Sequence, residues 1–569
     1  MMATTVMVRH TIKNMAKKKV LLAYLNLPMM FTPAIAAGLF NAIAKQEDIE
    51  FELFETAEYS DDYMNRHVRM AKLGANRGIV KTRSEDDYWW VKPESEIVSD
   101  FVAHVERFKP DFVLIHAQED VWAQGLDIVR ECNRIGVPHM FGGVLCISEP
   151  DWVLSHPDVN MICRYEGEEP VRQLFKALNA GTDVTKIDGI WYKDSEGNIK
   201  KNKPCPLVDI NAVSPDFSCY GDKRISKRWA RSMGGRHFNV SIAMETYRGC
   251  PYNCTYCNSP TTRDTAKALD LGNFMRRKSI DTIERELVDL IETWGLEFVT
   301  MVDDSFLARP AKEIFAFAEM WSKYKIPFWM NTRIENCKPE YLEAMKEAGM
   351  YRFNMGIESG NQEYRYKYLS RKVSDETYYE YFDYINQSNI PYGLNVIIGM
   401  PYETREHVMD TARMLKRAGG WDGLTISGFQ PYRGTALRQV ALDAGFIPPE
   451  YVNSGGLLAD NEKWSNLRMP KPYLQPEETH NLIKTLPLYA FYKEEEWDMV
   501  REAETNEQLY QELLATYRSI FYYGEYQAGG KDRNGYLKNS QKFCNKHDIS
   551  TTYNWEVREA DGIHQKAAI

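Results

Sequence analysis

Short apolar runs alternate with segments of helical periodicity along the first third of the chain. Five of these runs have the length and composition of buried parallel strands. They cover residues 20–25, 51–56, 111–116, 139–143 and 161–165. Strands that alternate with helices at these spacings predict an α/β domain with a doubly wound, Rossmann-like sheet. Ligands bind such sheets at the carboxyl ends of the strands.

A second alternation of strands and helices begins near residue 239 and repeats six times. The strand-like runs cover residues 240–244, 298–302, 328–333, 351–357, 394–398 and 424–429. The helices between them carry start signals, because Ser279 and Ser374 each precede a helical pattern that a serine can cap. Six such units predict a partial (β/α)6 barrel of the TIM type, with its active site at the carboxyl ends of the strands.

The patterns divide the chain into five parts. The C-terminal part is mainly helical and rich in aromatic residues, so its helices would either close the barrel mouth or pack on the side of the barrel. The parts are an N-terminal tail (1–17), the Rossmann-like domain (18–185), a linker with a hairpin (186–235), the barrel (236–447) and a C-terminal helical region with a polar tail (448–569).

Composition narrows the class of protein. A net charge of −10 argues against a nucleic-acid backbone as the main partner, because that partner favours a basic surface. No apolar run is long enough to span a bilayer, and residues 1–19 lack the apolar stretch of a signal peptide. Most of the ten cysteines are scattered singly, so they do not form a disulfide framework. We therefore expect a cytoplasmic protein.

Three cysteines depart from this scatter. Cys250, Cys254 and Cys257 follow the first barrel strand with the spacing C-x3-C-x2-C. Soft thiolates suit iron–sulfur clusters, and three of them would hold three corners of a [4Fe–4S] cluster and leave one iron open to a ligand. A zinc site would usually carry a second cysteine pair or histidine partners. No histidine lies between Asn239 and His407.

This spacing, with Tyr256 before the last cysteine, resembles the signature of the radical S-adenosylmethionine (SAM) superfamily. In that family the open iron chelates SAM, and an electron from the cluster splits the sulfonium to give a 5′-deoxyadenosyl radical. Residues 430–435 also match the family pattern after the sixth strand. Either of two adjacent aspartates would receive the SAM amino group. The SAM contacts that the resemblance implies are Asp303, Asp304, Asn331, Arg333, Glu358, Ser359, Arg371, Asn395 and Gly399.

The first domain resembles the cobalamin-binding domain of B12-dependent radical SAM enzymes through residues 141–150 and 165–168. The loop 26–33 lacks the cobalt-ligating histidine of many B12 domains, as do the relatives in this class. A Rossmann-like domain without cobalamin is the alternative, and His116 could equally be a structural histidine. The implied cobalamin contacts are Asn26, His116, Gly142, Gly143, Glu166, Gly167 and Glu168.

The two resemblances together imply a cobalamin-dependent radical SAM methyltransferase. One SAM would methylate cobalamin, and a second would yield the radical that abstracts hydrogen from an unactivated, sp3 carbon of the substrate, which then takes the methyl group. The implied partners are a methyl-acceptor substrate, either a small molecule or a peptide, and an electron donor such as flavodoxin or ferredoxin.

Three other functions remain open. Members of the same class catalyse oxidative cyclisation or rearrangement without methyl transfer. Methylthiotransferases resemble the barrel, but they usually carry three further cysteines in the first domain and a small C-terminal β-barrel. Here Cys132, Cys146 and Cys163 are scattered, and the C-terminal region is predicted to be helical. The third alternative is a cluster that senses iron or oxygen without catalysis.

Overall fold

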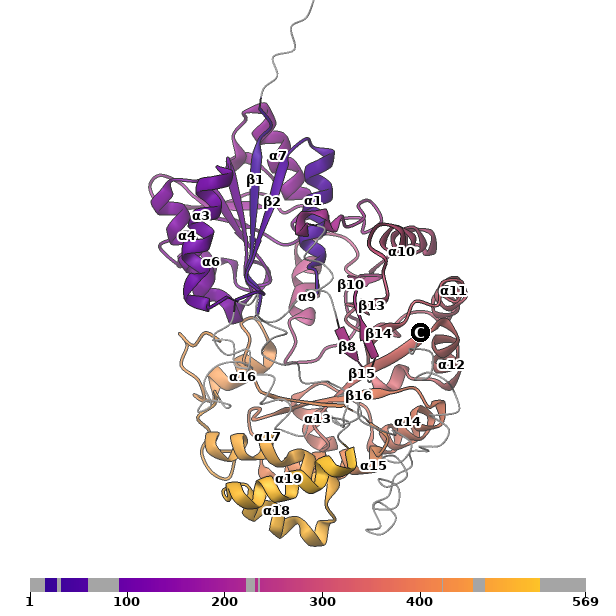
Figure 1. The fold of residues 1–569 in the computed structure, drawn as a ribbon. Helices are drawn as coiled ribbons and strands as arrows, with labels where there is room; N and C mark the ends of the chain where they lie inside the picture. Colours follow the sequence, from indigo (N-terminus) through magenta and orange to yellow (C-terminus); the bar gives the residue numbers. More distant parts are fainter. Residues whose placement is uncertain are drawn as a thin grey trace, which may run out of the picture.

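The computed structural model describes residues 16–27, 32–59, 92–221, 231–233, 236–421, 423–453 and 466–521. Most of the predicted N-terminal tail, part of the loop 26–33 and the C-terminal polar tail lie outside these residues. The described part contains two large, mainly parallel sheets, one in the upper and one in the lower half of the molecule (Figure 1). Within it, no helix combines the length and the apolar character needed to cross a membrane.

The first sheet has the strand order β2-β1-β3-β4-β5-β6-β7, and its first five strands run parallel. Side chains alternate between its faces, so Leu22 packs with residues of α1 and α7 while Leu21 packs with residues of α3 and α4. These two pairs of helices lie on opposite sides of the sheet (Figure 1). The predicted Rossmann-like fold is confirmed. Its elements are β1 (Lys19–Tyr24), α1 (Ile35–Gln46), β2 (Glu50–Glu55), α3 (Ile97–Phe108), β3 (Phe112–His116), α4 (Trp122–Ile135), β4 (His139–Gly142), α5 (Leu145–Ser148), α6 (Pro150–Ser155), β5 (Met161–Cys163) and α7 (Glu168–Ala180).

The hairpin of the predicted linker belongs to this sheet. Its strands are β6 (Ile190–Lys193) and β7 (Ile199–Lys201), and β6 pairs antiparallel with β5. An uncovered strand edge presents unpaired N–H and C=O groups, and the hairpin satisfies those of β5. The linker therefore contributes two strands to the first sheet. Two short pairs follow, β8 (Arg231–Met233) with β9 (Arg236–Phe238) and β11 (Tyr247–Arg248) with β12 (Arg276–Arg277).

The second sheet has six parallel strands in sequence order, which confirms the predicted partial barrel. Ser279 and Ser374 cap α10 and α14, as their patterns predict. The elements are β10 (Ser241–Met244), α9 (Ser259–Ala268), α10 (Ile280–Trp294), β13 (Phe298–Met301), α11 (Ala311–Trp321), β14 (Phe328–Thr332), α12 (Pro339–Ala348), β15 (Met350–Glu358), α13 (Gln362–Tyr368), α14 (Asp375–Ser388), β16 (Tyr392–Ile398), α15 (Arg405–Ala418), β17 (Gly423–Gly428) and α16 (Ala436–Asp443).

The C-terminal helices pack on the side of the barrel. They are α17 (Pro476–Phe491), α18 (Trp497–Ala503) and α19 (Glu507–Phe521). Helix α17 contacts α15, β16 and β17, and the three helices lie on the side of the barrel away from the first sheet (Figure 1). Arg405 of α15 is ion-paired with Glu504, which also accepts a hydrogen bond from Tyr489. Of the two predicted arrangements, the structure shows side packing.

The carboxyl ends of the two sheets are joined by a buried carboxylate. Glu119, in the turn after β3, accepts hydrogen bonds from the backbone N–H of Arg433 (2.7 Å) and of Asn453 (3.2 Å). Its neighbour Asp120 accepts one from the hydroxyl of Tyr432 (3.0 Å). The loop 430–435 after the last barrel strand is therefore held against the first domain.

Replacement of Glu119 with alanine is expected to weaken this junction. The buried N–H groups of Arg433 and Asn453 would lose their acceptors, and each unsatisfied donor costs about 1–3 kcal/mol. We expect a lower melting temperature, measured by circular dichroism. Glu106→Ala on the exposed side of α3 is the matched control. Equal melting temperatures for the two variants would contradict this role for Glu119.

Candidate active site

The cysteine motif lies in the loop between β11 and α9. All three are free thiols; Cys254 is buried, Cys250 is half-buried and Cys257 is exposed. Burial, together with the nearby carboxylate of Asp304, raises the pKa of the Cys250 thiol to about 11. Three neighbouring free thiols are the donor set that an iron–sulfur cluster uses. In the described part of the chain no group of three His, Cys, Asp or Glu side chains is arranged around a single metal ion. In a [4Fe–4S] cluster, by contrast, each of the three thiols would bind a different iron.

The two adjacent aspartates differ in their surroundings. Asp303 is buried and accepts hydrogen bonds from the backbone N–H of Thr246 (2.7 Å) and Tyr247 (3.0 Å), and it pairs with Arg309 (2.8 Å). It therefore holds the segment that leads to the cysteine loop. The Asp304 side chain is exposed. The protein atoms around it nevertheless shield its carboxylate from bulk water, and this shielding, together with the charges of Asp303 and Glu245, raises the pKa of Asp304 to about 6. Asp304 is the carboxylate that a ligand can reach.

Glu358 ends β15 in a left-handed conformation, with a φ of 61°. Its carboxylate accepts a hydrogen bond from the Tyr256 hydroxyl (3.0 Å), which in turn accepts one from Arg371 (3.1 Å). A Cβ atom at Gly356 would lie 1.9 Å from the Glu358 Oε1 atom, so only glycine leaves room for this carboxylate. Strained residues of this kind are concentrated at functional sites. The network ties the cysteine loop, through Tyr256, to the end of the fourth barrel strand.

The two predicted SAM-binding arginines are engaged with this framework. Arg333 donates a hydrogen bond to Cys254 Sγ (3.3 Å), and its guanidinium lies 3.9 Å from the centre of the Tyr252 ring. Arg371 is only 2% exposed and also donates to the Gly356 carbonyl. These bonds hold two nitrogens of Arg371 within the protein, while its buried Nε–H has no hydrogen-bond partner among the described residues.

The remaining predicted SAM contacts lie at strand ends with differing access. Asn331 and Asn395 are half-buried, and Asn395 accepts a hydrogen bond from Asn354 (3.4 Å). Ser359 is fully buried. The buried Gly399 donates its N–H to Glu403 (2.6 Å), a carboxyl group whose burial raises its pKa to about 8. Glu403 is not among the residues predicted from the sequence, although a carboxylate four residues after a strand-end glycine indicates a partner for that glycine.

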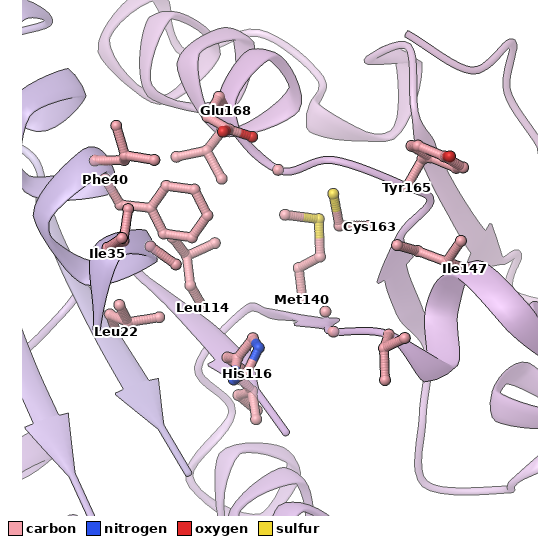
Figure 2. Close-up of a pocket in the computed structure, with 18 of the residues that line it drawn as sticks. Leu22, Ile35, Phe40, Leu114, His116, Met140, Ile147, Cys163, Tyr165 and Glu168 are labelled. Carbon is pink, nitrogen blue, oxygen red and sulfur yellow. The ribbon is translucent and has the colours of Figure 1, made fainter. Parts of the chain in front are cut away.

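A cavity of about 360 Å³ lies at the carboxyl ends of β1, β3, β4 and β5. Figure 2 shows its apolar side chains, with Ile35 and Phe40 on one side and Ile147 and Tyr165 opposite. Five predicted cobalamin contacts line it, and the barrel completes its wall. The five are His116, Gly142, Gly143, Gly167 and Glu168, and the barrel residues are Glu245, Arg248 and Val302.

At the floor of this cavity the backbone at Gly143 lies close to the backbone at Ala117. Gly143 has a φ of 127°, and a Cβ there would lie 2.3 Å from the Ala117 carbonyl oxygen. His116 stacks on Tyr24 with ring centres 4.3 Å apart, and burial lowers the pKa of its imidazole to about 4. Its Nδ1 atom is buried without a hydrogen-bond partner among the described residues. A largely apolar cavity with one neutral imidazole to satisfy fits a corrin ring with amide side chains.

Two predicted cobalamin contacts lie elsewhere. The Asn26 side chain accepts a hydrogen bond from the Leu27 N–H (2.9 Å) and does not line the cavity. Glu166 pairs with Arg248 (3.1 Å) and Arg276 because these guanidiniums from the barrel reach it. Neither residue lines this cavity, so a contact of either one with cobalamin stays a prediction. Glu166 joins the two domains through these ion pairs.

Arg248 is the centre of this junction. Its guanidinium pairs with Glu168 (2.7 Å) and Glu166 of the first domain and with Glu245 (2.9 Å) of the barrel. Glu168, Glu245 and Arg248 also line the cavity. Because Arg248 lies two residues before Cys250, the cavity wall and the cysteine loop are parts of one segment.

Comparisons with known proteins agree with this arrangement. The sequence model of the Radical SAM superfamily matches residues 244–415. An uncharacterized methyltransferase, PH0819, from Pyrococcus horikoshii is 26% identical over 353 residues, which are 60% of this chain and 72% of that protein. Cytidylyl-2-hydroxyethylphosphonate methyltransferase from Streptomyces wedmorensis is 23% identical over 385 residues, which are 62% of this chain and 70% of that protein.

Two solved structures share the fold across most of the chain. The cobalamin-dependent SAM radical enzyme OxsB, with aqua-cobalamin and SAM bound, has a TM-score of 0.58 at 16% identity, covering 94% of this chain and 76% of that one. The radical SAM methyltransferase TsrM from Kitasatospora setae, with cobalamin and a [4Fe–4S] cluster bound, has a TM-score of 0.54 at 13% identity, covering 88% and 99%. Residues 244–415 therefore match a radical SAM domain, and the chain shares the fold of these two cobalamin-binding enzymes.

Proposed function

We propose that the protein is a cobalamin-dependent radical SAM methyltransferase that transfers a methyl group from SAM to a carbon of a small-molecule or peptide substrate. The observation that carries this proposal is the shared cavity wall. Glu245, Arg248 and Val302 of the barrel line the cavity of the first domain, and they adjoin the cysteine loop and Asp304 in the sequence. A substrate at this wall would face both cofactor sites. The names of the two relatives described above support methyl transfer.

In this proposal the barrel mouth binds the cluster and SAM. Cys250, Cys254 and Cys257 hold three irons of a [4Fe–4S] cluster, and Asp304 accepts hydrogen bonds from the SAM ammonium group. Asp303 keeps the cysteine loop in place through its bonds to Thr246 and Tyr247. When bound, these groups supply the radical that abstracts hydrogen from the substrate. An external reductant, such as flavodoxin or ferredoxin, supplies the electron.

The first domain binds and orients cobalamin, which serves as the carrier of the methyl group. Gly143 keeps the cavity floor open for the flat ring, and His116 offers a neutral nitrogen to an amide group. The carboxylate of Glu168 lines the cavity and can accept from further amides. Apolar side chains such as Phe40 exclude water from the remaining wall. The described C-terminal residues form helices, in contrast to the small β-barrel expected of a methylthiotransferase.

The proposal is tested by anaerobic purification with hydroxocobalamin, followed by incubation with methyl-deuterated SAM and a reductant. We expect about four irons, the content of one such cluster, together with stoichiometric cobalt. Labelled methylcobalamin and 5′-deoxyadenosine should both form. Iron without cobalt would overturn the methyltransferase proposal. Once a substrate is found, its mass separates methylation, which adds CH₂, from rearrangement, which adds nothing.

The cavity floor gives a first prediction. In Gly143→Ala the new Cβ would collide with the Ala117 carbonyl oxygen, and overpacking of this kind costs about 1–3 kcal/mol. We expect cobalamin affinity, measured by ultrafiltration and absorbance, to fall about tenfold while iron content stays constant. Gly136→Ala is the matched control, since Gly136 also has a positive φ but no neighbour within 4 Å of the added Cβ. Equal affinities in both variants would show that the cobalamin site lies elsewhere.

The two aspartates give a second prediction. Asp304→Asn removes the carboxylate charge that a ligand can reach. The affinity for SAM should fall about tenfold, because a hydrogen bond to a charged group contributes about 1.5–3 kcal/mol. The melting temperature should stay unchanged. Asp303→Asn breaks a buried pair with Arg309 and should lower both the melting temperature and the iron content. Calorimetry measures the affinity for SAM and the melting temperature, and iron analysis measures the cluster content. If Asp303→Asn weakened only SAM binding while Asp304→Asn lowered the melting temperature and the iron content, the roles of the two aspartates would be exchanged.

A further inference from the structure

One guanidinium, that of Arg263 in α9, binds the loop between the first two cysteines of the motif. Its Nη1 atom donates to the carbonyl oxygens of Cys250 (3.5 Å), Pro251 (3.3 Å) and Tyr252 (3.2 Å). Its Nη2 atom donates to the Asn253 side chain (2.5 Å). Every residue from Cys250 to Asn253 therefore contacts the same cation.

Three consecutive carbonyl groups that converge on one point repel each other unless a cation lies between them. The planar, forked guanidinium supplies both the charge and several donors in one plane, which a lysine cannot do. The other partner of Arg263 is the neighbouring Asp264 (3.4 Å), whose side chain is 71% exposed. A surface ion pair of this kind contributes about 0–1 kcal/mol, so the loop is the main partner.

A second guanidinium contacts the loop as well. Arg333 donates to Cys254 Sγ and stacks on the ring of Tyr252, whose carbonyl binds Arg263. Tyr252 thus interacts with one cation through its backbone and with another through its side chain. The Tyr252 hydroxyl also donates to the Asn336 side chain (2.9 Å). Of these three anchoring residues, only Arg263 lies in the helix that follows the cysteine motif.

We propose that Arg263 is a positioning residue for the iron–sulfur cluster, and that its positive charge favours the one-electron-reduced, more negative state of the cluster. The inference rests on the proposed function, because it assumes a cluster on these three cysteines. Groups just outside the ligand shell orient the ligands, and their loss costs about 10–100-fold in metal affinity. Arg263 fills this role through the backbone of the loop.

The test compares Arg263→Lys, Arg263→Gln and the control Lys267→Gln. Lys267 is exposed, lies one turn along the same helix and loses the same charge in the control. The first measurement is hydrogen–deuterium exchange in the cluster-free protein. Amides in 250–257 should exchange faster in both Arg263 variants than in wild type, because local opening becomes easier. Lys267→Gln should match wild type.

The second measurement is a redox titration of the reconstituted cluster with dithionite, followed by electron paramagnetic resonance. The midpoint potential should be more negative in Arg263→Gln, which has lost the charge, and close to wild type in Arg263→Lys, which keeps it. Loss of iron to a chelator should be about tenfold faster in Arg263→Gln. The lysine variant keeps the test available if the glutamine variant does not fold.

The outcomes separate this inference from the proposed function. Wild-type protein that takes up no cluster would contradict the proposed function, while the exchange measurement would still test the anchoring of the loop. A cluster in wild type, with exchange and potential unchanged in Arg263→Gln, would overturn only the inference. A potential that shifts equally in Lys267→Gln would also overturn it, because the effect would then be one of general charge.

Discussion

A junction of half-buried charges around Arg248 joins the two domains. Three carboxylates, Glu166, Glu168 and Glu245, meet the guanidiniums of Arg248 and Arg276 where the carboxyl ends of the two sheets face each other. Removal of one partner would leave a half-buried charge without its counterpart. The same residues form part of the cavity wall and precede the cysteine loop. The geometry of both candidate cofactor sites therefore depends on one set of charges.

A second set of contacts holds the barrel side of the site. Tyr256 connects the cysteine loop to Glu358 and Arg371, and Asp303 connects the preceding segment to β13. These polar groups are buried and partnered, so they hold the site in place before any ligand arrives. The more exposed groups, such as Cys257 and Asp304, lie at the edge of this framework. The division between framework and reachable groups is what a preorganised radical site requires.

Much of the architecture could be predicted from the sequence, because apolar runs and helix caps are local signals. The runs at 20–25 and 111–116 became β1 and β3, and Ser279 and Ser374 cap the helices that they precede. The glycines of the cavity could also be predicted, since a strand-end glycine pair indicates close backbone approach.

The choices that could not be predicted depend on partners far away in the chain. Asp303 and Asp304 are the same residue type, and the contacts with Thr246, Tyr247 and Arg309 decide which carboxylate is buried. A carboxylate at a strand end, such as Glu166, has the same sequence signal whether it faces a cavity or Arg276 in another domain. The hairpin at 190–201 looked like part of a linker because its pairing with β5 is not encoded locally.

In the proposed arrangement one cavity wall serves both a cobalamin site and a cluster site. Electron paramagnetic resonance of protein that holds cob(II)alamin and the one-electron-reduced cluster together tests this arrangement. We expect a magnetic interaction, seen as splitting or as faster relaxation of the cobalt signal, which disappears when the cluster is oxidised. A spectrum equal to the sum of the two separate signals would contradict the shared wall.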